Sequence, residues 1–173
     1  MKRSLLEYPL PISFGLLVWA GAALSQGTGI QLQSVEENQQ EPVEVTSDLL
    51  TVDQLKGTAL FTGDVIVIQG EIRLNAPEML VQYIILPDGT VGSEVDTITA
   101  SGGVIMVTPT EEAASEEAVY TPAREEVVMT GDVLLTQGPN TLNGARLVFD
   151  VETGQGQMEG RVRTVLQPGS DTE

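Results

Sequence analysis

The sequence carries two carboxylates in matching surroundings, Asp64 and Asp132, each within the tetrapeptide Thr-Gly-Asp-Val. If folding brought them together, one could act as a general acid and the other as a general base. Each, however, follows a glycine where an alternating apolar pattern begins, which is typical of a turn. The chain has no histidine and no cysteine, so it lacks the commonest general base and the commonest metal ligand. We therefore expect no catalytic residue, no metal site and no cofactor, and a protein that is not an enzyme.

The matching surroundings extend beyond the two aspartates. Residues 62–81 and 130–149 share Thr-Gly-Asp-Val, Gln-Gly and Leu-Asn at the same offsets. Shorter Gly-x-Val units begin at Gly102 and Gly160. A recurring unit of this kind predicts repeated strand-turn-strand modules, in which each glycine marks a bulge or bend where a strand opens.

Apolar residues step by two along most of the chain from residue 43 onward. This period, with abundant valine, isoleucine and threonine, predicts an all-β fold of roughly a dozen short strands. Turn signals at 87–89, 138–140 and 152–154 separate the runs. The acidic stretch 108–118 breaks the alternation, and we expect a loop there. The clearest alternating pairs are Val65 with Val67, Val133 with Leu135, and Leu147 with Phe149.

These six residues would lie between two facing sheets. A filled sandwich core is the simpler interpretation, and the pattern alone favours it. An open groove would require the two sheets to be held apart, and alternation does not distinguish the two arrangements.

The amino-terminal segment has the features of a secretory signal. Lys2 and Arg3 precede an apolar run, and small residues lead up to Ser25. We predict a signal peptide over 1–25, cleaved after Ser25, with an uncleaved anchor as the alternative. A polar, Gln-rich lead-in over 26–42 is expected to be flexible, followed by one domain over 43–168 and a disordered tail over 169–173.

The charge of the chain excludes several classes of partner. Loss of residues 1–25 would lower Lys plus Arg from 8 to 6 and Asp plus Glu from 25 to 24, taking the net charge from −17 to −18. Nucleic acid and anionic lipid surfaces both require clustered cations, so we expect neither as a partner. Arg161 and Arg163 could meet a phosphate, although a solvated face is the simpler interpretation. The Gly-Gly-x-Gly-x-Asp repeat of a calcium-binding solenoid is absent.

Two long stretches, 42–83 and 118–168, resemble the LptA proteins of the OstA-like family of lipopolysaccharide export proteins. The resemblance rests on an ordered set of motifs. They are the Pro-hydrophobic-x-hydrophobic opening at Pro42, Phe-Thr-Gly-Asp-Val with Gln-Gly, a tyrosine strand before the second Thr-Gly-Asp, and the closing RVRTVLQP at 161–168.

The resemblance implies an open, twisted antiparallel β-jelly roll whose two facing sheets form a V. It implies a periplasmic protein that shelters the lipid A acyl chains of lipopolysaccharide in an apolar groove. It also implies head-to-tail self-association, an LptC-like inner-membrane partner and an LptD-like outer-membrane translocon. A same-fold sibling, such as the membrane-anchored LptC-type partner itself, is the alternative.

The resemblance also turns the inward-facing residues into a predicted lipid-binding groove. The family's opening strand falls on Val43 and Val45, and its tyrosine strand on Tyr120. Alternation from Gly103 favours Val104 and Met106 in the middle strand. The full set expected to line the groove is Val43, Val45, Val65, Val67, Val104, Met106, Tyr120, Val128, Val133, Leu135, Leu147 and Phe149.

Overall fold

The computed structural model describes residues 29–31 and 41–167 of the chain. The expected signal peptide and the expected tail lie outside these residues. The expected lead-in contributes a short strand, since Gly29–Gln31 pairs with Gln155–Gln157. The elements are β1 (Gly29–Gln31), β2 (Val43–Thr46), β3 (Leu49–Asp53), β4 (Thr58–Gln69), β5 (Ile72–Ile85), β6 (Val91–Val107), β7 (Glu111–Thr121), the 3₁₀ turn η2 (Pro122–Arg124), β8 (Glu126–Gln137), β9 (Asn140–Asp150), β10 (Gln155–Glu159) and β11 (Arg163–Val165).

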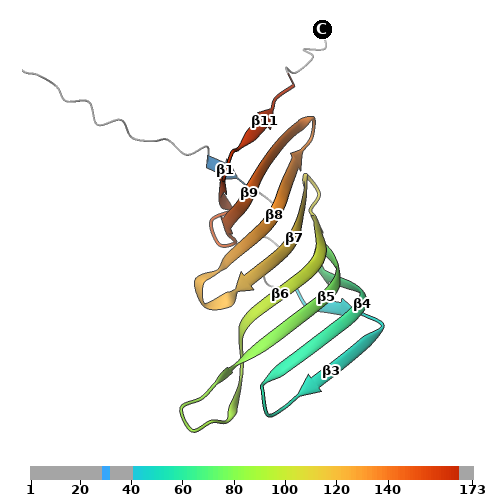
Figure 1. The fold of residues 1–173 in the computed structure, drawn as a ribbon, viewed down its shortest axis with the longest axis vertical. Coiled ribbons are helices and arrows are strands. Elements are labelled where there is room, and N and C mark those ends of the chain that lie inside the picture. The colour runs from blue at the N-terminus through green and yellow to red at the C-terminus, as the bar shows by residue number, and fades with distance from the viewer. Residues whose placement is uncertain (1–28, 32–40, 168–173) are drawn as a thin grey trace, which may run out of the picture.

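The strands form one continuous antiparallel sheet in the order β1-β10-β9-β8-β7-β6-β5-β4-β2. Two short strands lie off this path, with β3 paired to β4 and β11 paired to β9. Figure 1 shows the strands following one another along the long axis of the molecule, from β3 at one end to β11 at the other. The predicted fold class, an open and twisted antiparallel β-structure, is confirmed.

A line of bulges crosses the sheet and bends its long strands. The pairing register shifts where β4, β6 and β8 contain Gly63-Asp64, Gly102-Gly103 and Gly131-Asp132. All six residues have positive φ, which glycine adopts at little cost. An extra residue in one strand of a pair bends that strand and increases its twist. We call this line the crease; each long strand has one segment on either side of it.

The repeated Gly-x-Val units are therefore the crease, and one expectation about them was wrong. They lie inside β4, β6 and β8 rather than at strand openings. The structure describes eleven strands, close to the expected dozen, but several are longer than expected, reaching 17 residues in β6. Gly160 and Arg161 also have positive φ and carry the crease into the link between β10 and β11.

The acidic segment expected as a loop is a strand, β7. Its inward residues are Ala113 and Ser115 on one side of the crease, then Ala118 and Tyr120 on the other. The step from Ser115 to Ala118 is three residues, so the alternation changes phase within the strand. The carboxylates of Glu112, Glu116 and Glu117 are exposed. The acids therefore cover the outer face of a strand whose inner face is apolar or small.

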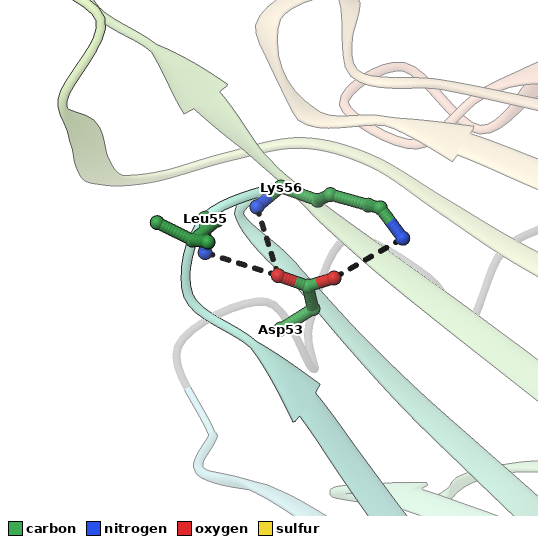
Figure 2. Close-up of polar contacts among 3 residues, drawn as sticks. All are labelled: Asp53, Leu55 and Lys56. Atoms are coloured by element: carbon green, nitrogen blue, oxygen red, sulfur yellow. Dashed lines mark hydrogen bonds and ion pairs between the residues drawn. The ribbon is translucent and has the colours of Figure 1, made fainter.

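Short polar networks fix the turns between strands. Figure 2 shows the turn after β3, where one carboxylate oxygen of Asp53 accepts hydrogen bonds from the backbone N–H groups of Leu55, at 3.0 Å, and Lys56, at 3.1 Å. The other oxygen lies 3.2 Å from the Lys56 ammonium group. The expected hairpin turn at 87–89 is confirmed, because Asp88 accepts hydrogen bonds from the N–H and the hydroxyl of Thr90. These carboxylates hold turns, as short acidic side chains commonly do.

Candidate functional site

The inner face of the bent sheet is almost entirely apolar. Its side chains form two clusters, which we name the open cluster and the closed cluster. The open cluster is built on β4 and β5, and its buried members are Ala59, Val65, Met79 and Val81. The closed cluster spans β5 to β10, and its buried members are Ala76, Ala100, Val104, Ala113, Ala118, Met129, Val133, Leu135, Leu142, Leu147, Phe149, Val151 and Met158.

The strand register aligns these side chains in rows that run across the sheet. We call the side of the crease that contains Val67 and Leu135 the near side, and the side that contains Phe61 and Met129 the far side. One row on the near side consists of Val45, Val67, Leu74, Met106, Ala113, Leu135 and Leu142. A row on the far side consists of Phe61, Met79, Ala100, Ala118, Met129, Leu147 and Met158. Because the sheet bends at the crease, these two rows approach each other across the inner face. We call the space between them the trough.

Ten of the twelve residues predicted to line a groove belong to these clusters or pack against them. Val45, Val65 and Val67 lie with the open cluster. Val43 precedes them on edge strand β2 and is 58% exposed. The other seven lie with the closed cluster: Val104, Met106, Tyr120, Val133, Leu135, Leu147 and Phe149.

Val128 is the other residue outside the clusters, and its expected placement was wrong. It lies next to the fully buried Met129 on β8, so it faces the opposite side of the sheet. Val127 is the neighbour that packs against the closed cluster. Counting back in twos from Val133 gives Met129 and Val127, so alternation alone could have identified both.

The predicted residues differ in how much of their surface is accessible. Val65, Val133, Leu135 and Leu147 are 0% exposed, which is the behaviour of a filled core. Val45, Val67, Met106 and Tyr120 are only partly buried. The inner face therefore combines a packed floor with apolar side chains that remain open to an occupant.

A cavity of about 80 Å³ lies in the trough and was not foreseen from the sequence. Leu74 and Met106 line it from the near side of the crease, and the remaining lining residues come from the far side. Its floor is Ala100 and Ala118, at 2% and 6% exposure. The full lining is Leu74, Met79, Ile98, Ala100, Met106, Ala118, Tyr120, Val127 and Met129.

A few polar side chains lie on the inner face among the apolar ones, including those of Ser115 and Tyr120. At the end of the inner face, the buried Glu111 carboxylate accepts hydrogen bonds from the Thr108 hydroxyl at 3.2 Å and the Gln137 amide at 3.1 Å. Among the described residues that line the cavity, Tyr120 contributes the one polar side-chain group, its phenol. Burial raises the pKa of this phenol, with a smaller contribution from the nearby Glu125 carboxylate, so it stays protonated at neutral pH.

Asp64 and Asp132 do not form a catalytic pair. They lie on β4 and β8, and three strands separate them in the sheet. At roughly 4.8 Å per strand, that is about 19 Å along the sheet. Both carboxylates are exposed at bulges, which supports their interpretation as turn residues. Arg161 and Arg163 are also exposed, as expected for a solvated face.

A second cavity, of about 320 Å³, lies beside the β8, β9 and β10 strands. Its lining mixes Arg124, Glu126 and Asp150 with the glutamines of β10. Arg124 faces Glu126 at 3.7 Å, so the cation there already has a partner.

Within 29–31 and 41–167, no cluster of three or more His, Cys, Asp or Glu is arranged to hold a metal ion. No helix in the same residues is long and apolar enough to cross a membrane.

Comparison with known families identifies the bent sheet. Residues 44–155 match the family described as "LptA/(LptD N-terminal domain) LPS transport protein". The chain belongs to this family. The match begins in β2 and ends at the first residue of β10, so it includes the open cluster, all of the closed cluster except Met158, and the bulges of β4, β6 and β8.

The chain is also similar to individual proteins along most of its length. An uncharacterised protein of Rhizobium meliloti is 31% identical over 90% of this chain and 87% of its own length. The lipopolysaccharide export system protein LptA of Escherichia coli is 30% identical over 88% of this chain and 84% of its own length. The crystal structure of LptH from Pseudomonas aeruginosa, described as the LptA-homologous periplasmic component of a lipopolysaccharide transport device, superposes with a TM-score of 0.65. That structure is 19% identical and covers 76% of this chain and 99% of its own, so it supports the fold.

Proposed function

We propose that this protein is a periplasmic lipopolysaccharide carrier whose trough shelters the acyl chains of lipid A during export. It forms part of a bridge between an LptC-like partner at the inner membrane and an LptD-like translocon at the outer membrane. The family membership supports a role in lipopolysaccharide transport. The observation that carries the acyl-chain assignment is the cavity in the trough, which is lined from both sides of the crease and has no charged side chain among its described lining residues.

An acyl chain is the ligand that such a surface fits. Each methylene group moved from water to an apolar surface gains about 0.8 kcal/mol. Partly buried side chains such as Val45, Val67 and Met106 offer that surface without first unfolding a packed core. The chain has 25 Asp and Glu against 8 Lys and Arg, so phosphates of the headgroup would be repelled over most of its surface. We therefore assign the acyl chains to the trough and the headgroup to solvent.

The experiment that tests this assignment places a photo-crosslinking amino acid at Met106 and, separately, at Ile105. These neighbours on β6 point to opposite faces of the sheet. Ile105 is 46% exposed, so non-specific labelling would be strong at this position. In cells making lipopolysaccharide, we expect an adduct at Met106 and none above background at Ile105. Equal labelling at the two positions would sink the trough assignment.

The two ends of the sheet support end-to-end assembly. At one end, β3 has β4 as its only described partner and exposes Leu49 and Leu50. At the other end, β11 has β9 as its only described partner and exposes Val165, and the exposed Leu166 follows directly after it. The two strands lie at opposite extremes of the long axis in Figure 1. Unprotected edge strands pair readily with another chain, and a head-to-tail contact extends into a filament.

A mixing experiment distinguishes head-to-tail contacts from other modes of association. Leu50→Lys blocks the β3 end, and Val165→Lys blocks the β11 end. Because a head-to-tail contact needs one end of each kind, each variant alone should sediment as a monomer. A mixture of the two still offers one intact pair of ends and should form a dimer. Assembly by either variant alone, at wild-type extent, would exclude these edges as the contact.

The cleaved signal separates the carrier from its membrane-anchored sibling. Amino-terminal sequencing of the exported protein should begin at Gln26. A mature protein that retains residues 1–25 would instead favour the LptC-type alternative, in which this segment anchors the chain.

A further inference from the structure

The trough is not uniform, because two neighbouring strands carry alanine where the other strands carry large side chains. In the row on the far side of the crease, Ala100 on β6 pairs with Ala118 on β7. Met79 flanks Ala100 on β5, and Met129 flanks Ala118 on β8. Beyond them the row continues with Phe61 on one side and Leu147 on the other. The cavity lies over these two alanines, so the missing side-chain volume is what creates it.

The walls of this cavity are suited to a flexible apolar occupant. Three methionines, Met79, Met106 and Met129, contribute to the lining. Methionine is unbranched and polarisable, so it adapts to guests of different shape. Met129 and Met79 are 1% and 4% exposed, whereas Met106 is only partly buried and lies at the mouth. A cavity lined by apolar side chains takes up apolar guests in preference to water.

The volume sets the size of the guest. At about 80 Å³, the cavity is smaller than the roughly 150 Å³ cavities that are known to bind benzene. It therefore has room for the terminal portion of a hydrocarbon chain and not for a whole acyl chain. Tyr120 and Ile98 occupy the next row along the same strands and line the cavity beyond the two alanines.

We infer that Ala100 and Ala118 are specificity-determining residues that set the acyl-chain length the trough accepts. They admit the terminal methylene groups of one acyl chain into the cavity between the methionines. This inference rests on the proposed function and adds a length preference to it. An acyl chain that reaches the cavity gains about fourfold in affinity for each methylene group that is buried there.

The test measures binding of two purified lipid A species that differ only in acyl-chain length, the shorter by a few methylene groups. Wild-type protein should bind the longer species at least tenfold more tightly. Ala118→Leu fills the cavity and should reduce that ratio to within about twofold, with little loss for the shorter species. Ala114→Leu is the matched control, because Ala114 lies on the same strand and pairs with Ile105 and Leu134 on the outer face. It should keep the wild-type ratio.

A second variant keeps the test decisive if Ala118→Leu does not fold. Met106→Ala trims a partly exposed side chain at the mouth and should shift the preference further toward the longer species. A preference that is unchanged in whichever of these variants folds would overturn the inference while leaving the carrier function intact. Failure of wild-type protein to bind either species would instead count against the proposed function itself.

Discussion

The bulge at Gly63-Asp64 and the bulge at Gly131-Asp132 have the same backbone in different surroundings. The glycine φ angles are 81° and 84°, and the aspartate φ angles are 41° and 45°. In both copies the valine that follows is 0% exposed. The motif Thr-Gly-Asp-Val therefore encodes one local device, a bulge that buries a valine immediately after it.

The neighbouring strands differ between the two copies. Gly131 lies on β8 between two long strands, and Glu116 of β7 is beside it. Gly63 lies on β4, whose outer partner is interrupted at this point. There the backbone N–H of Asp48, in the link between β2 and β3, donates a 3.0 Å hydrogen bond to the Gly63 carbonyl.

The surroundings decide what each copy does for the protein. Among residues 41–167, Val65 belongs to a cluster with four buried members, and Val133 to one with thirteen. The second copy therefore sits in a packed scaffold, whereas the first sits at the accessible end of the trough. The motif therefore determines the local geometry, while the neighbouring strands determine how extensive the surrounding apolar cluster is.

The largest expected contrast lies between two phenylalanines on the inner face. Phe149 is 1% exposed in the closed cluster, so Phe149→Ala should lower the free energy of unfolding by roughly 3–5 kcal/mol. Phe61 only packs against the edge of the open cluster, so Phe61→Ala should cost less than half as much. Urea unfolding of the two variants measures both. Equal losses of unfolding free energy would show that the open cluster is packed as tightly as the closed cluster.

The two bulge glycines should show a smaller difference in stability with the same sign. Substitution beside the closed cluster should cost more than substitution beside the open cluster. Replacing either with alanine forces positive φ on a residue with a Cβ, at a cost of about 1–2 kcal/mol. A Cβ at Gly131 would also lie 2.6 Å from the Cβ of Glu116, within a strand paired on both sides. At Gly63 the clash is with Asp48, on an exposed link that can move. Gly131→Ala should therefore be the more destabilising of the two.

A matched control isolates the backbone contribution. Gly138 has φ of 54°, and a Cβ at this position would meet nothing within 4 Å, so Gly138→Ala reports the cost of positive φ alone. Thermal unfolding should rank the melting temperatures as Gly138→Ala highest, then Gly63→Ala, then Gly131→Ala. A Gly63→Ala protein that melts below Gly131→Ala would contradict the role assigned to the flanking strands.

The bulges also explain which strands could be predicted from the sequence. On β4 and β8, the inward residues keep the same parity across the crease, as Val65 and Phe61 do. Alternation therefore identified these strands directly. On β5, β7 and β9, the inward positions step by three at the crease, as from Ser115 to Ala118. A period-two pattern fails at such a step, which is why β7, with its acidic outer face, was mistaken for a loop.

The family and the inner face followed from motifs, but the cavity did not. Large apolar residues at alternating positions, such as Leu135 and Leu147, indicate a buried face of a strand. Ala100 and Ala118 give no such signal, because alanine is common on both buried and exposed positions. The cavity depends on two alanines being adjacent across strands, and that adjacency comes from a register that the bulges shift. Only the three-dimensional structure supplies it.

Carboxylates beside the two clusters should make the stability of the protein respond to pH in opposite directions. Beside the closed cluster, the pKa of Glu125 is raised, chiefly by repulsion from Glu152 and a side-chain hydrogen bond to it, and also by Asp150. The folded state then holds this proton more tightly than the unfolded state, so stability falls as pH rises above the ordinary value of 4.5. Glu125→Gln should melt higher than wild type at neutral pH, and the two curves should converge in acid. A constant offset across pH would contradict this origin.

The turn after β3 should respond in the opposite sense, with the smallest effect. The pKa of Asp53 is lowered, chiefly by hydrogen bonds with the backbone and side chain of Lys56 (Figure 2). Its contribution to stability is therefore present above the ordinary carboxyl value of 3.8 and is lost as pH falls through the lowered value.

Asp53→Asn should consequently melt slightly below wild type at neutral pH, and the difference should vanish in acid. Because both partners are exposed, salt should reduce the difference further. The decisive measurement is the sign of the melting-temperature difference at neutral pH, taken for Asp53→Asn and Glu125→Gln under identical conditions. Opposite signs are expected. The Asp53 carboxylate, which is paired with Lys56, stabilises the turn after β3, whereas the crowded carboxylates of Glu125 and Glu152 destabilise the region beside the closed cluster. If both differences had the same sign, local pairing would not be what sets the pH response at the two ends.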